Sequence, residues 1–241
     1  MTKYGSPDVA FFLVDGLSLV GTLTEFSDQH EAVIEETTPL GTGWEEQTFA
    51  GVRKGEISQD GYYDDAAMSA HDALSSGPGT ARILAYGLEG TATGKRFTAY
   101  QGAMQVNYER LSKRDELTKA KAQYKSSGQV EQGRVLFSYG AVGSTGRKNA
   151  YDGAASSTGA AGYLSYNATA GEANVRIMHS SDNITYAALF VFAKIASGHG
   201  AERVVTTGVI ERYVAADFTT ATATGSIGAL NAMVGIVYDV I

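Results

Sequence analysis

Short runs of alternating hydrophobic and polar residues, separated by glycine-rich turns, recur along most of the chain. Val9–Val14, the dipeptide Asp15-Gly16 and Leu17–Leu23 have the pattern of a hairpin with a two-residue turn. Ala81–Leu88 is a further expected strand, with glycines on both sides. Within Met104–Glu109 apolar and polar residues alternate, and we expect the apolar side chains to form the buried face.

The same strand pattern continues to the end of the chain. Further strands are expected at Lys119–Tyr124, Arg134–Tyr139, Ala161–Asn167, Val175–Ser180, Tyr186–Ala193, Arg203–Thr207, Val209–Ala215 and Leu230–Val240. In the last of these, every second residue from Leu230 to Val240 is apolar and falls on one face. The last six of these strands, from Ala161–Asn167 onward, are short and evenly spaced without helical periods between them, and they predict a C-terminal β-sandwich.

One stretch has helical rather than strand periodicity. Residues 63–75 place Tyr63, Ala67, Ala70 and Leu74 on one stripe, and a glycine- and proline-containing turn follows. We therefore expect a single helix here, packed by that stripe against a sheet.

Two other stretches lack clear periodicity. Residues 37–59 predict a long loop, which is unusual within a compact domain and is often functional. Residues between 140 and 162 contain six glycines and many Ser, Thr and Ala, and they predict a boundary. The expected organisation is a first domain at 1–140, a Gly/Ser/Ala-rich boundary at 141–160, and an outer domain at 161–241.

Composition and charge narrow the class of protein. The chain has 241 residues, 44% of them hydrophobic, no cysteine and a net charge of −7. Such a chain is globular, lacks disulfides and thiolate chemistry, and has no basic excess for wrapping nucleic acid. No apolar run is long enough to span a membrane, so no membrane association is expected. Residues 25–65 hold 11 acids and two bases, whereas residues 110–125 hold six bases and two acids.

No arrangement of residues indicates catalysis, and we expect neither an enzyme nor a cofactor. The four histidines, His30, His71, His179 and His199, are not at metal-ligand spacings. Gly143–Lys148 lacks the spacing and residues of a phosphate-binding loop. Adjacent acids such as Glu45 and Glu46 point to opposite faces if they lie on a strand, so they are poor catalytic pairs.

Residues 173–215 resemble a β-sandwich module appended to major tail tube proteins of phages with long non-contractile tails. The matching elements are His179–Asp182, Tyr186–Phe192, Glu202-Arg203 and Gly208–Val214. The lead-in, from Tyr151 through Gly159 and then from Gly162 to Tyr166, also fits this module.

The first half resembles the tube domain of the same family. The features in common are the hairpin at 8–23, the long segment at 36–60, the helix at 63–75 and Gly128–Gly133 leading into a strand. The resemblance implies a mainly β fold. It consists of an N-terminal tube domain, with two packed antiparallel sheets forming a sandwich or barrel beside one helix, and a C-terminal β-sandwich.

The resemblance also implies a structural virion protein. Six copies would form a ring, and stacked rings would form a tail tube whose lumen conducts phage DNA without binding it specifically. The implied partners are other copies of the chain, a tape measure protein, and tail terminator and tip proteins, with assembly in the host cytoplasm. Open strand edges that another subunit must cover suit such an assembly, and an acidic lumen would let DNA slide.

A binding module is the alternative. A β-sandwich of this kind could recognise carbohydrate or a host surface through an aromatic platform, for which Tyr163, Tyr166, Tyr186 and Tyr213 are the candidates. Most aromatic residues on strands belong to the core, which favours the structural reading.

The long loop and the basic block are the expected contact surfaces between subunits. Opposite charges in one chain can pair within a subunit or between subunits. We expect Trp44 to act as an apolar anchor on a neighbour, with charge fixing the register; the alternative is that Trp44 is a core residue of its own subunit. The candidate contact residues are Trp44, Glu45, Glu46, Phe49, Arg53, Arg110, Lys113, Arg114, Lys119 and Lys121.

Overall fold

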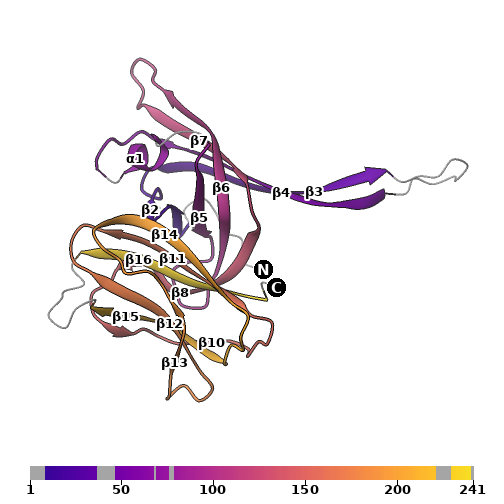
Figure 1. Ribbon diagram of the computed structural model, residues 1–241. Coiled ribbons are helices and arrows are strands. Elements are labelled where there is room, and N and C mark those ends of the chain that lie inside the picture. Colours follow the sequence, from indigo (N-terminus) through magenta and orange to yellow (C-terminus); the bar gives the residue numbers. More distant parts are fainter. Residues whose placement is uncertain (1–8, 37–46, 68, 76–78, 221–228, 240–241) are drawn as a thin grey trace, which may run out of the picture.

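The computed structural model describes residues 9–36, 47–67, 69–75, 79–220 and 229–239. Within these residues the chain forms sixteen strands and one short helix (Figure 1). In chain order the elements are β1 (Phe11–Val14), β2 (Leu17–Ser18), β3 (Leu23–Glu36), β4 (Gln47–Tyr62), α1 (Ala70–Ser75), β5 (Ala81–Gly87), β6 (Arg96–Leu111), β7 (Lys119–Ser126), β8 (Val130–Ala141), β9 (Gly146–Arg147), β10 (Tyr151–Asp152), β11 (Ala160–Ala168), β12 (Ala173–Ser180), β13 (Ala187–Val191), β14 (Gly198–Thr206), β15 (Tyr213–Thr220) and β16 (Leu230–Tyr238).

Eleven of the described strands form one sheet that forks at β6. Its main path is β14-β11-β16-β8-β6-β5-β1-β2, and β7, β4 and β3 branch from β6. One edge of β6 pairs with β8 between Arg96 and Tyr100 and with β7 between Ala103 and Leu111. Strands β7 and β8 therefore follow one another along the same edge. The sheet continues from β7 into β4 and β3, and from β8 into β16, β11 and β14.

Three clusters of buried side chains hold the elements together. Between the main sheet and a smaller five-stranded sheet, Ile236 of β16 and Phe218 of β15 belong to one cluster. A second cluster lies where Leu74 of α1 packs against β1, β5, β6 and β7. In the third, Phe97 of β6 and Tyr163 of β11 meet edge to face at 5.9 Å on the main path of the larger sheet. Burial of this apolar surface is the main driving force for the fold.

The expected fold class is confirmed: the chain is mainly β, with two antiparallel sheets and, among the described residues, one helix. The predicted turn also forms. Asp15 and Gly16 connect β1 to β2 with φ values of 46° and 85°, as a two-residue hairpin turn of this type requires. The alternation in β16 places Leu230 and Val234 in the cluster between the sheets, as expected.

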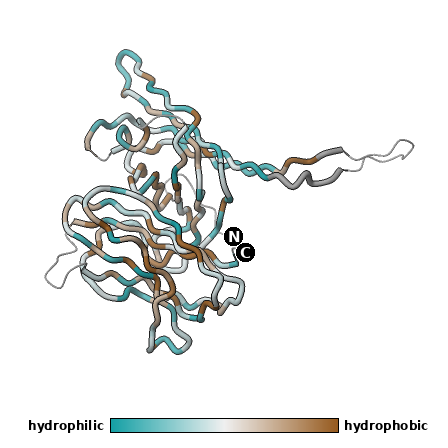
Figure 2. Tube along the Cα trace, in the orientation of Figure 1, coloured by the Kyte–Doolittle hydropathy of each residue, from teal (hydrophilic) through white to brown (hydrophobic). Residues whose placement is uncertain are grey.

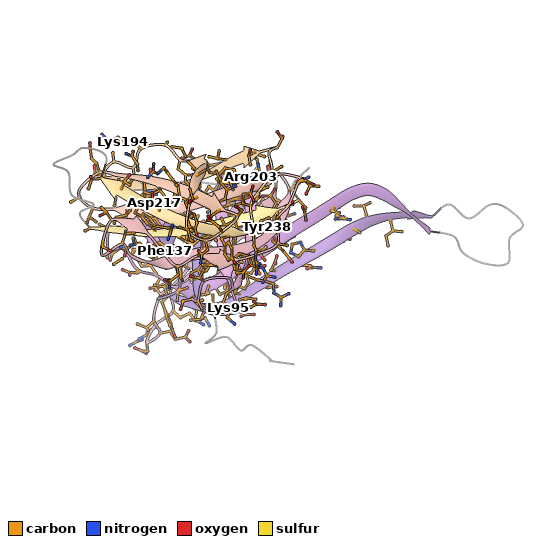
Figure 3. All side chains as sticks on the ribbon, turned by 90° about the horizontal axis from the view of Figure 1, so that it is seen from below. Lys95, Phe137, Lys194, Arg203, Asp217 and Tyr238 are labelled. Atoms are coloured by element: carbon orange, nitrogen blue, oxygen red, sulfur yellow. The ribbon has the colours of Figure 1, made fainter. Side chains whose placement is uncertain are left out.

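A long two-stranded ribbon projects from the body (Figures 1 and 3). We call it the arm: residues 29–36 of β3 and 47–55 of β4, beyond the last pairing of β4 with β7. The prediction of a loop over 37–59 is therefore wrong for residues 47–59, and residues 37–46 lie outside the described residues. Residues 29–34, 53 and 54 of the arm are largely exposed on both faces and need no apolar alternation, so the arm is mostly hydrophilic near the body (Figure 2).

The helix is shorter than its sequence pattern suggests. Of the predicted span 63–75, only the part from Ala70 onward is helical. Tyr63 still belongs to the sheet region, because its backbone N–H donates to the carbonyl of Thr118 at 2.9 Å. Ala70 and Leu74 are buried as expected, so the second half of the predicted stripe is correct.

The expected burial on β6 is reversed at one place. Met104 and Val106 are exposed by 38% and 40%, while Gln105 between them is fully buried. The amide Nε2 of Gln105 donates to the carbonyl of Leu74 at 2.8 Å, at the end of α1. A register shift against β7 follows between Gln105 and Asn107. The carbonyl of Leu74 is a buried acceptor, and leaving it unpaired would cost free energy. Its hydrogen bond with Gln105 therefore decides which face of β6 is buried here.

Two further features differ from the expected organisation. Residues 209–215 do not form one strand; β14 ends at Thr206 and β15 begins at Tyr213. The main sheet also crosses the predicted boundary, because β8 pairs with β6 on one edge and with β16 on the other. The division at 141–160 stays a prediction.

Candidate inter-subunit interface

Strands β3, β4, β7 and β6 form a region with two unlike faces, which we call the four-strand region. One face packs beneath α1 and buries Ile57, Ala122 and Tyr124. The other face carries rows of almost entirely polar side chains. Their order across β3, β4, β7 and β6 is Glu25–Asp60–Lys121–Glu109, Ser27–Ser58–Gln123–Asn107 and Gln29–Glu56–Lys125–Met104.

The first of these rows joins the acidic and basic blocks of the sequence within one chain. The Nζ atom of Lys121 lies 2.5 Å from the carboxylate of Asp60. Hydrogen bonding to Asp60 raises the pKa of Lys121, and the charges of Glu109 and Glu25 raise it further. The row holds three acids and one base, so this row is acidic.

The four-strand region has a free edge on each side. Strand β3 pairs only with β4 among the described strands, so its outer edge is open. On the other side, β5 covers β6 only as far as the pair Ala81–Met104. Gly79 adds one hydrogen bond to the carbonyl of Gln105 at 2.9 Å, and β6 continues to Leu111 with no described strand beside that edge. Unpaired edges of this kind are templates for pairing with another chain.

The arm and the β6–β7 turn project from opposite ends of the four-strand region (Figure 1). The arm begins beyond the pair Glu56–Lys125, whereas the turn, residues 112–118, follows the pair Leu111–Lys119. We call this turn the tip. It carries Leu117, which is 71% exposed, and the arm carries Ile34, which is 57% exposed.

The structure places the predicted contact residues as follows. Trp44, Glu45 and Glu46 lie outside the described residues, and Phe49 lies in β4 with its backbone opposite Ile34. The other candidates are Arg53 on the arm, Arg110 at the end of β6, Lys113 and Arg114 on the tip, and Lys119 and Lys121 on β7. Except for Lys121 they are exposed, and the bases of 110–121 gather toward one end of the region.

The base of the arm holds a polar cluster that the sequence pattern did not reveal. The carboxylate of Asp28 accepts hydrogen bonds from the hydroxyls of Tyr86 and Tyr100, and it lies 2.9 Å from Nε2 of His30. Burial, and after it the hydrogen bond to Asp28, raises the pKa of each of the two tyrosines. Residues 58 and 72 positions apart give no local signal, so only the register of the strands could locate this cluster.

A second buried cluster links β8, β11 and β14 within one branch of the main sheet. Glu131 of β8 accepts two hydrogen bonds from the Arg203 guanidinium of β14, at 2.5 and 3.0 Å, and one from the hydroxyl of Tyr163. The glutamate side chain is only 6% exposed. Burial, and after it the hydrogen bond to Glu131, raises the pKa of the Tyr163 hydroxyl. A buried carboxylate needs such partners, so the cluster has a structural role.

Among the described residues, no group of three or more His, Cys, Asp or Glu side chains is placed to hold a metal ion. No helix in the described part of the chain is long and apolar enough to cross a membrane.

The proposed aromatic platform is incomplete. Tyr163 is fully buried and Tyr166 packs on the core between the sheets. Tyr186 and Tyr213 remain at the surface, and the guanidinium of Arg147 covers the ring of Tyr186 at 3.8 Å. The four tyrosines do not share one surface.

Comparisons with known proteins found similar solved structures among components of tails and virions. No protein-family model and no curated protein matches the chain. Several solved structures are similar to it, among them the tail of an empty gene transfer agent particle with C6 symmetry, the virion of a native gene transfer agent particle, and the SPP1 Dit protein, a hub of the adsorption apparatus in phages that infect Gram-positive bacteria.

The two gene transfer agent proteins are 16% and 14% identical to this chain, each with a TM-score of 0.42. Each match covers 53% of this chain and 97% of the other. The Dit protein is 11% identical with a TM-score of 0.35, and the match covers 94% of this chain and 97% of Dit.

Proposed function

We propose that the protein is a tail tube subunit that forms rings by joining the free edge of β3 in one copy to the free edge of β6 in the next. The observation that carries this proposal is the position of these edges on opposite sides of one four-strand region. Two different edges give a head-to-tail contact, and such contacts generate rings when the rotation closes.

The strand directions suit this contact. The pairs β3–β4, β4–β7 and β7–β6 are all antiparallel, so β3 and β6 run in opposite directions. A neighbour's β3 placed beside β6 therefore continues the antiparallel order around the ring. Six copies, the number implied by the family resemblance, would make one continuous barrel.

In this ring the polar face of the four-strand region lines the lumen, since the opposite face is covered by α1. The row of Glu25, Asp60 and Glu109 around Lys121 makes this part of the wall acidic rather than basic. Phosphate groups gain little from such a wall, so DNA passes through without being held. The protein would thus reside in the virion and conduct DNA during ejection.

Stacking of rings uses the two projecting ends. The arm of one ring reaches the tip of a copy in the next ring, where Lys113 and Arg114 meet the acids of the arm. In this arrangement Trp44 supplies the apolar anchor, and Glu45 and Glu46 set the register by charge. Isolated two-stranded ribbons are only marginally stable in water, which is why the arm is expected to have a partner. The tape measure, terminator and tip proteins would bind the completed tube.

Cysteine cross-linking tests the ring contact directly, because the chain has no cysteine of its own. Asn107→Cys is combined with Ser27→Cys or, for a shifted register, with Gln29→Cys. Within one chain β3 and β6 are three strand spacings, about 14 Å, apart. A disulfide needs Cα atoms within roughly 7 Å, so only neighbouring copies can be joined.

Oxidised assemblies of one of these pairs should show a ladder of covalent oligomers up to the hexamer on a non-reducing gel. Each single-cysteine variant is a control, because a head-to-tail contact gives it no partner thiol. Assembled tubes that yield only monomers with both pairs would contradict the ring contact.

A further inference from the structure

The acidic row of the four-strand region reaches both of its free edges. The row Glu25–Asp60–Lys121–Glu109 begins on the outer edge of β3 and ends on the outer edge of β6. If a neighbour's β3 simply continued this row, Glu109 of one copy would lie directly opposite Glu25 of the next. Like charges directly opposite one another on adjacent strands are destabilising. A symmetric ring would repeat this repulsion at each of its contacts.

The backbone of β3 also disfavours this unshifted contact. The register of β3 against β4 changes between Leu23 and Glu25, so the strand is irregular at Thr24. In the unshifted contact Arg110 of β6 would lie opposite Thr24. A shift of one residue pair moves Arg110 opposite Phe26, in the regular part of β3, where an additional strand can pair without interruption.

The handedness of the sheet fixes the direction of a shift. In the proposed ring the face beneath α1 points outward. Gly55 of β4 belongs to this face, because a Cβ atom there would meet Tyr100, and its N–H donates to Oγ of Ser126 on β7 at 2.9 Å. In an L-residue whose strand runs upward and whose side chain faces the viewer, the N–H points to the right. Seen from outside with β4 running upward, β7 and β6 therefore lie to the right of β4, whereas β3 lies to the left and runs downward.

Closure of the sheet into a barrel requires a stagger in this direction. Strands of a closed barrel tilt, and their right-handed twist makes them rise to the right when seen from outside. A row perpendicular to the strands therefore descends to the right, whereas copies related by the ring axis lie at the same height. The row that leaves Glu109 thus reaches the next copy below its Glu25. Because β3 runs downward, this position lies farther along β3, toward the arm.

We propose that the ring contact is staggered by one residue pair toward the arm, so that Glu109 of one copy lies opposite Ser27 of the next. Asn107 then lies opposite Gln29, and the displacement along the strands is about 7 Å. This inference rests on the proposed ring contact and specifies its register. The hydroxyl of Ser27 donates to the carboxylate of Glu109, so a hydrogen bond replaces the repulsion between acids. A shift by a second pair would place Asn107 opposite Glu31 of the arm, where β4 no longer has β7 beside it.

The rate of disulfide formation in assembled tubes tests this register. Three double variants combine Asn107→Cys with Ser27→Cys, with Gln29→Cys or with Glu31→Cys. Directly opposite residues on antiparallel strands have Cα atoms about 4.5–5.5 Å apart, whereas diagonal neighbours are about 7–8 Å apart. Since a disulfide needs Cα atoms within roughly 7 Å, the Gln29→Cys pair should form covalent oligomers about tenfold faster than the other two.

A second set of variants removes the repulsion between acids from the comparison. Glu109→Cys is combined with Ser27→Cys, the staggered pair, or with Glu25→Cys, the unshifted pair. Neither variant has a charge at position 109, so only barrel closure and the backbone of β3 decide between the two registers. The Ser27→Cys pair should again react faster.

Negative-stain microscopy shows that each variant forms tubes before oxidation. If Asn107→Cys prevents folding or assembly, the Glu109→Cys set decides the register by itself. Fastest cross-linking of Asn107→Cys with Ser27→Cys or Glu31→Cys, or of Glu109→Cys with Glu25→Cys, overturns the stagger while the ring contact stands. Assembled tubes in which no pair gives covalent oligomers overturn the ring contact, and the stagger with it.

Discussion

The carboxylate of Asp60 on β4 lies 2.5 Å from the ammonium group of Lys121 on β7, and this ion pair brings the acidic and basic blocks of the sequence together inside one chain. Glu25 and Glu109 flank the pair in the same row of the sheet. The lysine is thus the one base among three acids, and its charge offsets their mutual repulsion.

Reversing this charge should lower stability in a salt-dependent way. Lys121→Glu leaves four acids in one row, so its melting temperature at low ionic strength should fall below that of the unmodified chain. Added salt screens exposed charges and should narrow the difference. The swap Asp60→Lys/Lys121→Asp restores an opposite pair and is the matched control. Equal melting temperatures for the reversal and the swap at low salt would show that the row contributes nothing.

Removing Arg203, the partner of the buried carboxylate of Glu131, should lower the free energy of unfolding by more than the change at the surface residue Lys121. Arg203→Met leaves Glu131 desolvated and without its two guanidinium hydrogen bonds, so stability should fall by about 3–5 kcal/mol in urea unfolding. The double variant Arg203→Met/Glu131→Leu removes the charge as well and should recover much of this loss. A single variant as stable as the parent would mean that water replaces the arginine.

The turn between β1 and β2 depends on a glycine. At Gly16, where φ is 85°, a Cβ atom would meet the carbonyl oxygen of Tyr166 and lie 2.6 Å from that of Gly200. Gly16→Ala should therefore lose about 2 kcal/mol or more of stability, through both strain and steric conflict. Gly143→Ala has open space around it and is the control, with an expected change within about 0.5 kcal/mol.

Acid should destabilise the protein through surface aspartates whose pKa is lowered by hydrogen bonds. The backbone N–H groups of Ile184 and Thr185, and the hydroxyl of Ser180, lower the pKa of Asp182 below its ordinary 3.8. The unfolded chain then binds this proton more readily. The contribution is therefore complete above pH 3.8 and is lost as the pH falls through the folded pKa.

Melting temperatures between pH 5 and pH 2.5 check this. Asp182→Asn keeps an acceptor oxygen but cannot titrate, so the melting temperature of this variant should depend less steeply on pH. Asp65→Asn is the control, because Asp65 is exposed and accepts no hydrogen bond from a described residue. A slope unchanged in Asp182→Asn but reduced in Asp65→Asn would contradict the assignment.

Local requirements made several elements predictable from sequence. The alternation from Leu230 to Tyr238 and the Asp15-Gly16 turn appear in the structure as expected, because each responds to a local requirement: a buried face or a positive φ. The arm was missed because its residues meet no such local requirement. Residues 29–34, 53 and 54 are largely exposed on both faces and need no periodicity, and the glycines and charges of residues 29–36 and 47–55 have the composition of a loop.

The sequence by itself determined the class of fold, the short β-hairpin near the start and the separation of acidic from basic blocks, since these depend on neighbours in the chain. Only the tertiary structure decided that Asp60 meets Lys121 within the subunit, that Asp28 meets two distant tyrosines, and that Gln105 is buried. Each of these depends on strand register, and a shift of one residue would turn every side chain to the other face. Register is fixed by packing of the whole sheet, which no local pattern encodes.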